Sequence, residues 1–256
     1  MVKGLYTAYT GMINEQYRMD VLTKNLANAA TVGFKKEGAT SQSFDQVLAY
    51  KIKDTTEASQ ARPLGRMSLG VKVGEHYTDY SQGSLRETGN VYDLAISGTG
   101  FFSIEFTNKA GKTSTKYTRD GGFTLNKDGY LVTKDGDYVL GKAGRIKLDP
   151  LQPTSIDQLG NIWQNGKQVA TLKITDYEDY NYLEHYGENY YQLADGEKEK
   201  DGEYKIVSGY VEMSNVQVVS EMVEMISVSR AYETNQKIVQ SYDSTLEIAA
   251  NQLGKV

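Results

Sequence analysis

The sequence of 256 residues contains no cysteine, which excludes disulfides, thiolate metal sites and cysteine nucleophiles. Its only two histidines, His76 and His185, exclude a histidine-rich metal site. There is no run of eighteen apolar residues that would predict a membrane-spanning helix. The first residues also lack the continuous apolar core of a Sec-type signal peptide. We therefore expect a cytoplasmic chain, or one exported by a route that reads no such signal.

Basic residues do not outnumber acidic ones. The chain has 28 Lys and Arg against 33 Asp and Glu, a formal net charge of −5. Because nucleic acids are bound through basic surfaces, this balance argues against a nucleic-acid partner. Proline is scarce (3 residues), whereas tyrosine (20) and glycine (25) are abundant. This composition is typical of β-structure with many turns.

The C-terminal residues, from about 211 to 253, predict one long helix. Neither proline nor glycine interrupts them between Gly209 and Gly254. A seven-residue apolar repeat sustained over this length predicts a partner helix. The repeat positions are Val218, Met225, Tyr232, Val239, Leu246 and Leu253.

The first part of this predicted helix is apolar around most of its circumference. Eight of the thirteen residues from 216 to 228 are apolar, among them Met222 and Ile226. Such a segment must be covered on several sides. It is either a buried helix in one large core or a helix that packs against other copies of the chain, and we favour the second interpretation.

The N-terminal residues, from about 4 to 30, predict a second helix with a seven-residue repeat. Only Glu15 interrupts the apolar seam of this helix. Gly33 follows the segment and is a residue type that commonly ends helices. We expect this helix to pair with the C-terminal one as a coiled coil. The seam consists of Leu5, Ala8, Met12, Met19, Leu22, Leu26 and Ala29.

Between the helices the pattern changes twice. Residues 35–70 are mostly polar, and Pro63 and Gly65 punctuate their end. From residue 71 the apolar residues alternate, and the turn sequences Lys134-Asp135-Gly136 and Asn165-Gly166 predict hairpins.

The predicted fold class is therefore α+β. We expect long N- and C-terminal helices paired as a coiled coil, with an inserted, mainly antiparallel β domain. The expected parts are a coiled-coil helix (1–34), an extended linker (35–70), a β-rich outer domain (71–208) and a second coiled-coil helix (209–256).

No pattern of catalytic residues emerges. Residues 97–100, Ser-Gly-Thr-Gly, lack the third glycine of a dinucleotide-binding loop and lead into a strand-like sequence. Asn126, Asp128 and Asp135 lack the spacing and closing glutamate of a calcium loop. We predict a protein that is not an enzyme, with no catalytic, cofactor-binding or metal-binding residues and no cofactor.

Separate blocks of sequence resemble the bacterial flagellar rod and hook proteins. Residues 24–35 read Lys-Asn-Leu-Ala-Asn-Ala-Ala-Thr-Val-Gly-Phe-Lys, with Lys24 where the family has Asn. Residues 82–102 and 117–132 resemble the beginning of the family's β domain. Residues 209–216 and 230–237 resemble its C-terminal helix. The motif residues are Asn25, Leu26, Ala27, Asn28, Gly33, Phe34, Arg230, Ala231, Tyr232, Glu233 and Asn235.

The resemblance implies a structural subunit of the flagellar basal-body rod. Such a subunit would be exported by the flagellum's own type III apparatus, without a cleaved signal. It would polymerise helically through its terminal helices into a drive shaft that transmits torque from motor to hook. The implied partners are further copies of the chain, other rod and hook subunits, the export apparatus and the bushing ring, with no nucleic acid and no membrane insertion.

Alternatives remain open at this point. Residues 230–235, together with Met-Asp-Val at 19–21 and Leu-Ala-Asn at 26–28, favour a distal-rod type. Residues 141–144, Gly-Lys-Ala-Gly, are closer to proximal-rod relatives, and we favour the distal type. A secreted enzyme acting on cell-wall glycan could use carboxylates such as Glu178 and Asp179. An adhesive β module on a helical stalk is a third possibility.

Overall fold

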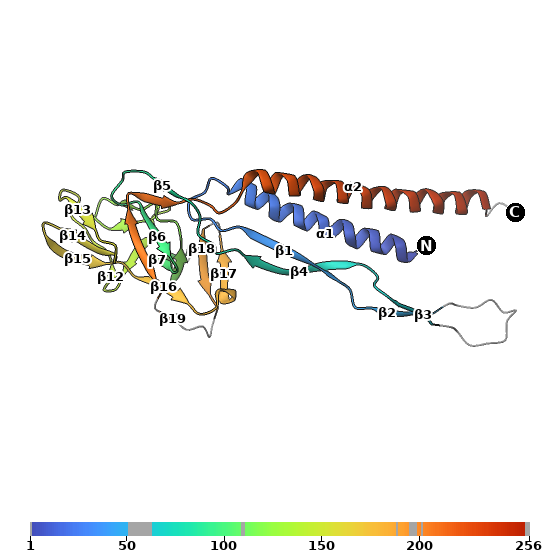
Figure 1. Ribbon diagram of the computed structural model, residues 1–256, viewed down its shortest axis with the longest axis horizontal. Helices are drawn as coiled ribbons and strands as arrows, with labels where there is room; N and C mark the ends of the chain where they lie inside the picture. The colour runs from blue at the N-terminus through green and yellow to red at the C-terminus, as the bar shows by residue number, and fades with distance from the viewer. Residues whose placement is uncertain are drawn as a thin grey trace. The chain divides into compact units, whose positions relative to one another are not determined.

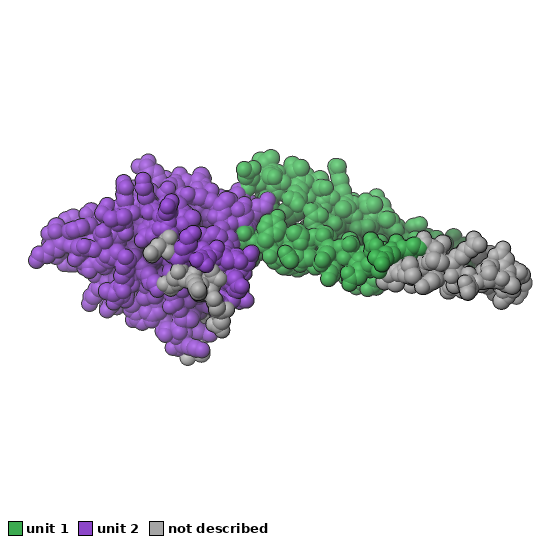
Figure 2. Space-filling model, turned by 60° about the horizontal axis from the view of Figure 1, so that its bottom comes forward, with its two compact units in different colours: residues 1–27, 37–78, 217–256 green, residues 28–36, 79–216 purple. Residues whose placement is uncertain are grey.

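The computed structural model describes residues 2–50, 63–108, 111–187, 189–194, 199–200 and 202–253. The chain forms two compact units, which Figure 2 shows in different colours. Unit 1 comprises residues 1–27, 37–78 and 217–256, and unit 2 comprises residues 28–36 and 79–216. The chain therefore passes between the units four times.

The predicted fold class is wrong. Strands account for 39% of the chain and helices for 28%, so the protein is mostly β with one helix near each end (Figure 1). The described residues show no long coiled-coil pair, although a β-rich domain is present.

Unit 1 holds both long helices. Helix α1 spans Val2–Ala27, and α2 spans Val218–Ile248 and ends in the π-helical residues Ala249–Leu253. Two antiparallel strand pairs accompany them, β1 with β4 and β2 with β3. The strands are β1 (Glu37–Ser43), β2 (Val47–Tyr50), β3 (Pro63–Met67) and β4 (Val71–Thr78).

The contacts between α1 and α2 explain why the coiled-coil prediction fails. A Cβ atom on Gly4 would lie 2.2 Å from the hydroxyl oxygen of Tyr242, and one on Gly11 would lie 3.0 Å from Nδ2 of Asn235. The partners step by seven residues in opposite directions, so the helices run antiparallel. Small and polar residues meet along this line, whereas a coiled coil needs apolar side chains inserted between those of its partner.

The C-terminal helix is shorter than predicted. It begins at Val218, whereas Tyr210–Glu212 form strand β21, which pairs with β5 (Leu85–Glu87). Gly209 precedes β21 with φ +82°, a left-handed conformation that favours glycine and turns the chain before the strand. At the other end, α1 stops at Ala27, three residues before the predicted boundary.

The segment expected to be a linker contains strands. Strand β1 pairs with β4 from Glu37↔Thr78 to Ser43↔Val71, with a register shift between Ala39 and Ser41. Figure 1 shows this pair alongside α1. Asn14 on α1 donates from Nδ2 to Oγ of Ser41 at 2.9 Å, so the strand pair covers part of α1. Residues 51–62 of the expected linker lie outside the described residues.

Unit 2 is built from short antiparallel strands, as every pairing among its described residues is antiparallel. Besides β5 and β21, they are β6 (Leu94–Gly98), β7 (Phe101–Thr107), β8 (Thr113–Thr118), β9 (Thr124–Leu125), β10 (Leu131–Val132), β11 (Tyr138–Gly141), β12 (Gly144–Arg145), β13 (Thr154–Ile156), β14 (Asn161–Gln164), β15 (Lys167–Thr171), β16 (Ile174–Tyr177), β17 (Leu183–Tyr186), β18 (Tyr190–Leu193), β19 (Glu199–Lys200) and β20 (Tyr204–Ser208). A 3₁₀ turn, Tyr180–Tyr182, precedes β17.

The main sheet runs in the order β17-β18-β8-β7-β11-β10-β9, and β12, β16 and β19 join it at the side. Both predicted hairpins are confirmed. Val132 pairs with Tyr138 across residues 133–137, and β14 pairs with β15 across Asn165 and Gly166. These two turn residues have φ +49° and +73°, the positive values that such a tight hairpin requires.

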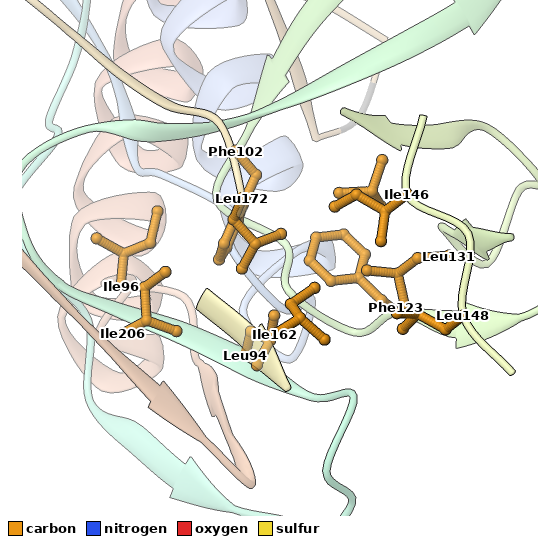
Figure 3. Close-up of a cluster of buried hydrophobic side chains, with 11 residues drawn as sticks. Leu94, Ile96, Phe102, Phe123, Leu131, Ile146, Leu148, Ile162, Leu172 and Ile206 are labelled. Atoms are coloured by element: carbon orange, nitrogen blue, oxygen red, sulfur yellow. The ribbon is translucent and has the colours of Figure 1, made fainter. Parts of the chain in front are cut away.

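The apolar core of unit 2 takes its side chains from strands of the main sheet, from β6, β14 and β20, and from the loops between strands. Figure 3 shows its side chains pointing toward one another from many different strands. Burying them stabilises the unit through the hydrophobic effect. They are Leu94, Ile96, Phe102, Phe123, Leu131, Val139, Ile146, Leu148, Ile162, Leu172 and Ile206.

A second cluster is aromatic and includes Phe101, Tyr117 and Tyr191. Tyr180 packs its ring edge-on against Phe101 with ring centres 5.8 Å apart, and its hydroxyl donates to Asp176 at 2.6 Å. Burial, and then the hydrogen bond and charge of Asp176, raise the pKa of Tyr180 to about 12.

This shift predicts a loss of stability in alkali. An unfolded tyrosine ionises near pH 10, whereas folded Tyr180 keeps its proton up to about pH 12. Its contribution is therefore complete below pH 10 and is lost as the pH rises from 10 to 12. Two pKa units correspond to ~2.7 kcal/mol, and partial exposure of the ring reduces this figure. Urea unfolding at pH 9, 10.5 and 12 measures the difference in the free energy of unfolding between the parent chain and Tyr180→Phe. This difference should become smaller as the pH rises, because only the parent loses the contribution of the tyrosine. A difference that does not change with pH would contradict the raised pKa of Tyr180.

Candidate assembly site

The first three turns of α2 expose a group of apolar side chains, which we call the apolar face of α2. Val219 is 76% exposed and Val223 63%, and the others are between 42% and 54%. Their spacing places them on one side of the helix, away from the positions that contact α1. The group comprises Val218, Val219, Met222, Val223 and Ile226.

The side of α2 that faces α1 carries two series of residues that are each spaced by seven. Val228 is buried at 2% exposure, and Asn235 and Tyr242 contact the two glycines of α1. Met225, Tyr232 and Val239 are half-buried. Of the predicted assembly residues on α2, Val218, Met222 and Ile226 belong to the apolar face, and Met225, Tyr232 and Val239 belong to the side that faces α1.

The remaining predicted assembly residues are distributed as follows. On α1, Leu22 is buried and Leu5, Met12, Met19 and Leu26 are half-buried. On α2, Leu246 is 45% exposed. The side chain of Leu253 lies outside the described residues.

Polar contacts hold the two helices in register at the end where α2 begins. The fully buried Asn25 donates from Nδ2 to Oε2 of the fully buried Glu221 at 3.1 Å. Asn25 also bonds the backbone of Glu37, donating to its carbonyl oxygen at 2.8 Å and accepting from its N–H at 3.0 Å. Arg18 pairs with Glu224 at 3.0 Å. Because buried polar groups must find partners, these contacts permit one alignment of the helices.

The other motif residues of the N-terminal block lie at, or directly after, the C-terminal end of α1. Leu26 and Asn28 are half-buried, and Ala27 is exposed. On α2, Arg230 and Glu233 are exposed, and Ala231 is half-buried.

Unit 2 contains a cluster of buried charges formed by Lys35, Arg119 and Glu212. Lys35 Nζ lies 2.5 Å from Oε1 of Glu212, and Arg119 lies 3.2 Å from its Oε2. The side chains of all three are at most 4% exposed. Glu212 also accepts the N–H of Gly83 at 2.9 Å, so both of its oxygens are used. One carboxylate therefore joins segments that are distant in the sequence.

Electrostatics within this cluster are set by burial. Removal from water lowers the pKa of Lys35, while the charge and hydrogen bond of Glu212 act in the opposite direction. Arg119 is the second cation and lowers the pKa of Lys35 further. Two cations that share one carboxylate depend on it strongly, because a buried charge without a partner is costly.

Gly33 and Phe34 fix the backbone directly before Lys35. Gly33 has φ +73°, and its N–H donates to the carbonyl oxygen of Glu212 at 2.8 Å. Phe34 is completely buried. Within unit 2, both the backbone of Gly33 and the side chain of Lys35 therefore bond to Glu212.

Sequence reasoning did not select Lys35, Arg119 and Glu212 as functional residues. A signal was nevertheless present, because each lies in a block that resembles the flagellar family: 24–35, 117–132 or 209–216. What the sequence does not display is that these blocks meet at one carboxylate.

The described residues hold no group of three or more His, Cys, Asp or Glu side chains arranged to bind a metal ion. Within the same residues, no helix combines the length and the apolar character needed to cross a bilayer.

Three family models match separate parts of the chain. The model for flagella basal body rod proteins matches residues 5–35, and that for the D1 domain of the flagellar hook proteins FlgE, FlgF and FlgG matches residues 95–164. The model for the C-terminal part of the flagellar basal body rod FlgEFG proteins matches residues 207–253.

Relatives match over almost the whole chain. It is 32% identical to the flagellar basal-body rod protein FlgG of Bacillus subtilis strain 168, covering 98% of this chain and 99% of that protein. It is 30% identical to the flagellar hook-basal body complex protein FlhO of the same organism, covering 100% of both chains. The chain belongs to the flagellar basal-body rod family. Identity to the rod protein FlgF of Caulobacter vibrioides is 30%, again over 100% of both chains.

As a member of this family, the protein is a structural subunit of the rod and is located in the flagellar basal body. It assembles with other rod and hook subunits. The buried charge cluster takes one residue from each segment that a family model matches: Lys35 from 5–35, Arg119 from 95–164 and Glu212 from 207–253.

Proposed function

We propose that this rod subunit is incorporated through the apolar face of α2, which packs against neighbouring subunits. The observation that carries the proposal is the exposure of five apolar side chains within nine residues, with Val219 76% exposed. Burying one such side chain contributes ~1.5–3 kcal/mol. Single exposed apolar residues are common on proteins, but a contiguous group of this kind marks an interaction surface.

The position of this face favours an open assembly. It lies on one side of α2, and α1 of the same chain covers the other side, so this face is free to contact a different surface on the next copy. A surface that contacts a different surface on the next copy extends the assembly when the rotation between copies does not close a ring. The proposal is therefore a helical polymer in which packed side chains transmit torque as a drive shaft.

The proposal also includes further copies of this chain, the type III export apparatus and the bushing ring as partners. These three partners are proposed from the resemblance of the motif blocks and from membership of the flagellar rod family. A subunit whose work is done by packing needs no catalytic step, and we accordingly propose that it is not an enzyme.

Substituting the apolar face should block incorporation without unfolding the chain. The change is Val219→Asp together with Val223→Asp, at positions that are 76% and 63% exposed. Because both side chains already face solvent, we expect the free energy of unfolding to change by less than ~1 kcal/mol. Produced in a strain lacking the parent gene, the variant should leave cells non-motile, with incomplete rods in electron micrographs of isolated basal bodies.

A matched control carries the same added charge on the same helix. Gln240 and Ser244 are exposed polar residues in the later part of α2. Gln240→Asp with Ser244→Asp should preserve swimming. Normal motility of the valine variant, or equal loss in both variants, would remove the apolar face from the proposal.

A further inference from the structure

A cavity of about 430 Å³ opens on unit 2 beside the hairpin of β7 and β8. Strands β17 and β18 complete its walls. Phe106 and Tyr186 contribute aromatic rings that meet edge to face with centres 5.4 Å apart. Among the described residues that line it, Lys112 and Lys116 are the charged ones, and none is Asp or Glu.

Lys116 is the unusual member of this cavity. The residue is only 4% exposed, yet it takes part in no ion pair among the described residues. Its Nζ donates to Oε1 of Gln192 and lies 3.8 Å from the centre of the Tyr186 ring. Glu184 stands opposite Gln192 in the register of β17 and β18, but it forms no ion pair with Lys116.

The other buried cations of the described chain are arranged differently. Lys35 and Arg119 both pair with Glu212 inside unit 2. Burial also lowers the pKa of Lys116, and no carboxylate opposes that shift as Glu212 does for Lys35. A buried ammonium with only an amide and a ring as partners is destabilising for the isolated subunit. Lys116 thus has an unused capacity to bind a carboxylate.

We propose that this cavity receives an Asp or Glu side chain from a second copy of the chain, whose carboxylate pairs with Lys116. Each copy carries 33 acidic against 28 basic residues, so a neighbouring copy presents an excess of carboxylates to a cavity whose charged residues, within the described part of the chain, are both lysines. Tyr186, which is 37% exposed, supplies the aromatic surface that is enriched at the centre of protein interfaces.

This site deepens the proposed function, on which it rests, because it gives unit 2 its own contact with a neighbouring subunit. A carboxylate bound by a desolvated lysine forms a charge-assisted hydrogen bond, which is stronger than one between neutral groups. Such pairs fix the register between partners. The site would therefore set which rotation between copies is accepted in the rod.

The direct test is zero-length carbodiimide cross-linking of isolated basal bodies, followed by mass spectrometry of the peptides. The reagent joins an amine to a carboxylate only when the two are in contact. We expect a cross-link from Lys116 to an Asp or Glu peptide of this same protein that is absent from the isolated soluble chain. The Lys24–Glu37 pair, at 2.6 Å within one chain, is the internal positive control.

Two results of this experiment would overturn the proposal. One is the absence of a Lys116 cross-link in rods in which Lys24 and Glu37 are joined. The other is a cross-link from Lys116 to a different protein.

Lys116→Met gives an independent measurement, because methionine keeps an apolar stem of similar length and removes the charge. The isolated variant should unfold at a higher urea concentration than the parent chain, since it no longer buries an unpaired ammonium. Rods built from it should dissociate at a lower urea concentration than parental rods. Lys112→Met, an exposed lysine of the same cavity, should change neither midpoint.

The two proposals fail in different ways. If the apolar face of α2 is not an interface, its valine variant assembles normally. If the cavity is not a contact site, Lys116→Met rods dissociate at the same urea concentration as parental rods, whatever the valine variant does.

Discussion

Replacing Glu212 by Gln should lower the free energy of unfolding by about 3–5 kcal/mol, a large part of the stability of a domain. The amide is almost isosteric with the carboxylate, so the change removes charge with little change in volume. Lys35 and Arg119, whose side chains are 1% and 4% exposed, then remain buried without a counter-ion. Urea unfolding followed by tryptophan fluorescence measures the loss, because the single Trp163 lies in unit 2.

The matched control for this change is Glu105→Gln. Glu105 accepts two hydrogen bonds from Arg145, at 2.7 and 2.8 Å, but the side chain of Arg145 is 44% exposed. An exposed ion pair contributes only about 0–1 kcal/mol. Similar losses in the two variants would mean that burial of the Glu212 cluster does not determine its contribution to stability.

The importance of the Glu212 cluster could be predicted only in part from the sequence. The blocks that contain its residues can be recognised, because their glycines and charged residues follow a family pattern. Their meeting point cannot, because Glu212 bonds Lys35 across 177 residues and Arg119 across 93. Local periodicity reports which face of an element is apolar, and it carries no information on contacts over such separations.

The helices illustrate the same limit. Seven-residue spacing correctly predicts a helix near each end, because that period follows from helix geometry. It does not say what covers the apolar side. Part of α1 is covered by β1 and β4, where Tyr17 contacts His76, and its contact with α2 runs through small and polar residues. A partner helix is the simplest interpretation of the repeat, and the polar sequence of residues 35–70 does not indicate a strand pair.

The predicted start of α2 is wrong for a related reason. Val211 and Val216 extend the apolar pattern toward the N-terminus, so the sequence predicts an earlier helix start. In the structure both are buried in unit 2, and only the residues after Gln217 are helical. Strand β21 needs β5 as its partner, and that partner lies more than a hundred residues earlier in the chain. Tertiary pairing of this kind overrides local helix propensity.

Gly33→Ala is expected to be the second severe change. At φ +73° a side chain is strained, and the added Cβ would lie 2.3 Å from the backbone N of Asp120 and 2.5 Å from the carbonyl carbon of Arg119. Backbone atoms in a packed unit cannot move aside as a flexible side chain can. Backbone strain and overpacking together predict a loss of about 2–6 kcal/mol in the free energy of unfolding.

Gly89→Ala separates the two causes of that loss. Gly89 has the same φ of +73°, but nothing lies within 4 Å of its added Cβ. It should therefore show only the cost of the left-handed backbone, about 1–2 kcal/mol. Urea unfolding measures the loss in the free energy of unfolding for both variants. The loss for Gly33→Ala minus the loss for Gly89→Ala is the cost of the close contact with Arg119 and Asp120. Equal losses would show that this contact is unimportant. Gly33 donates to the backbone of Glu212 and lies two residues before Lys35, so displacing Gly33 also moves Lys35 away from the Glu212 carboxylate. We therefore expect Gly33→Ala to impair swimming far more than Gly89→Ala.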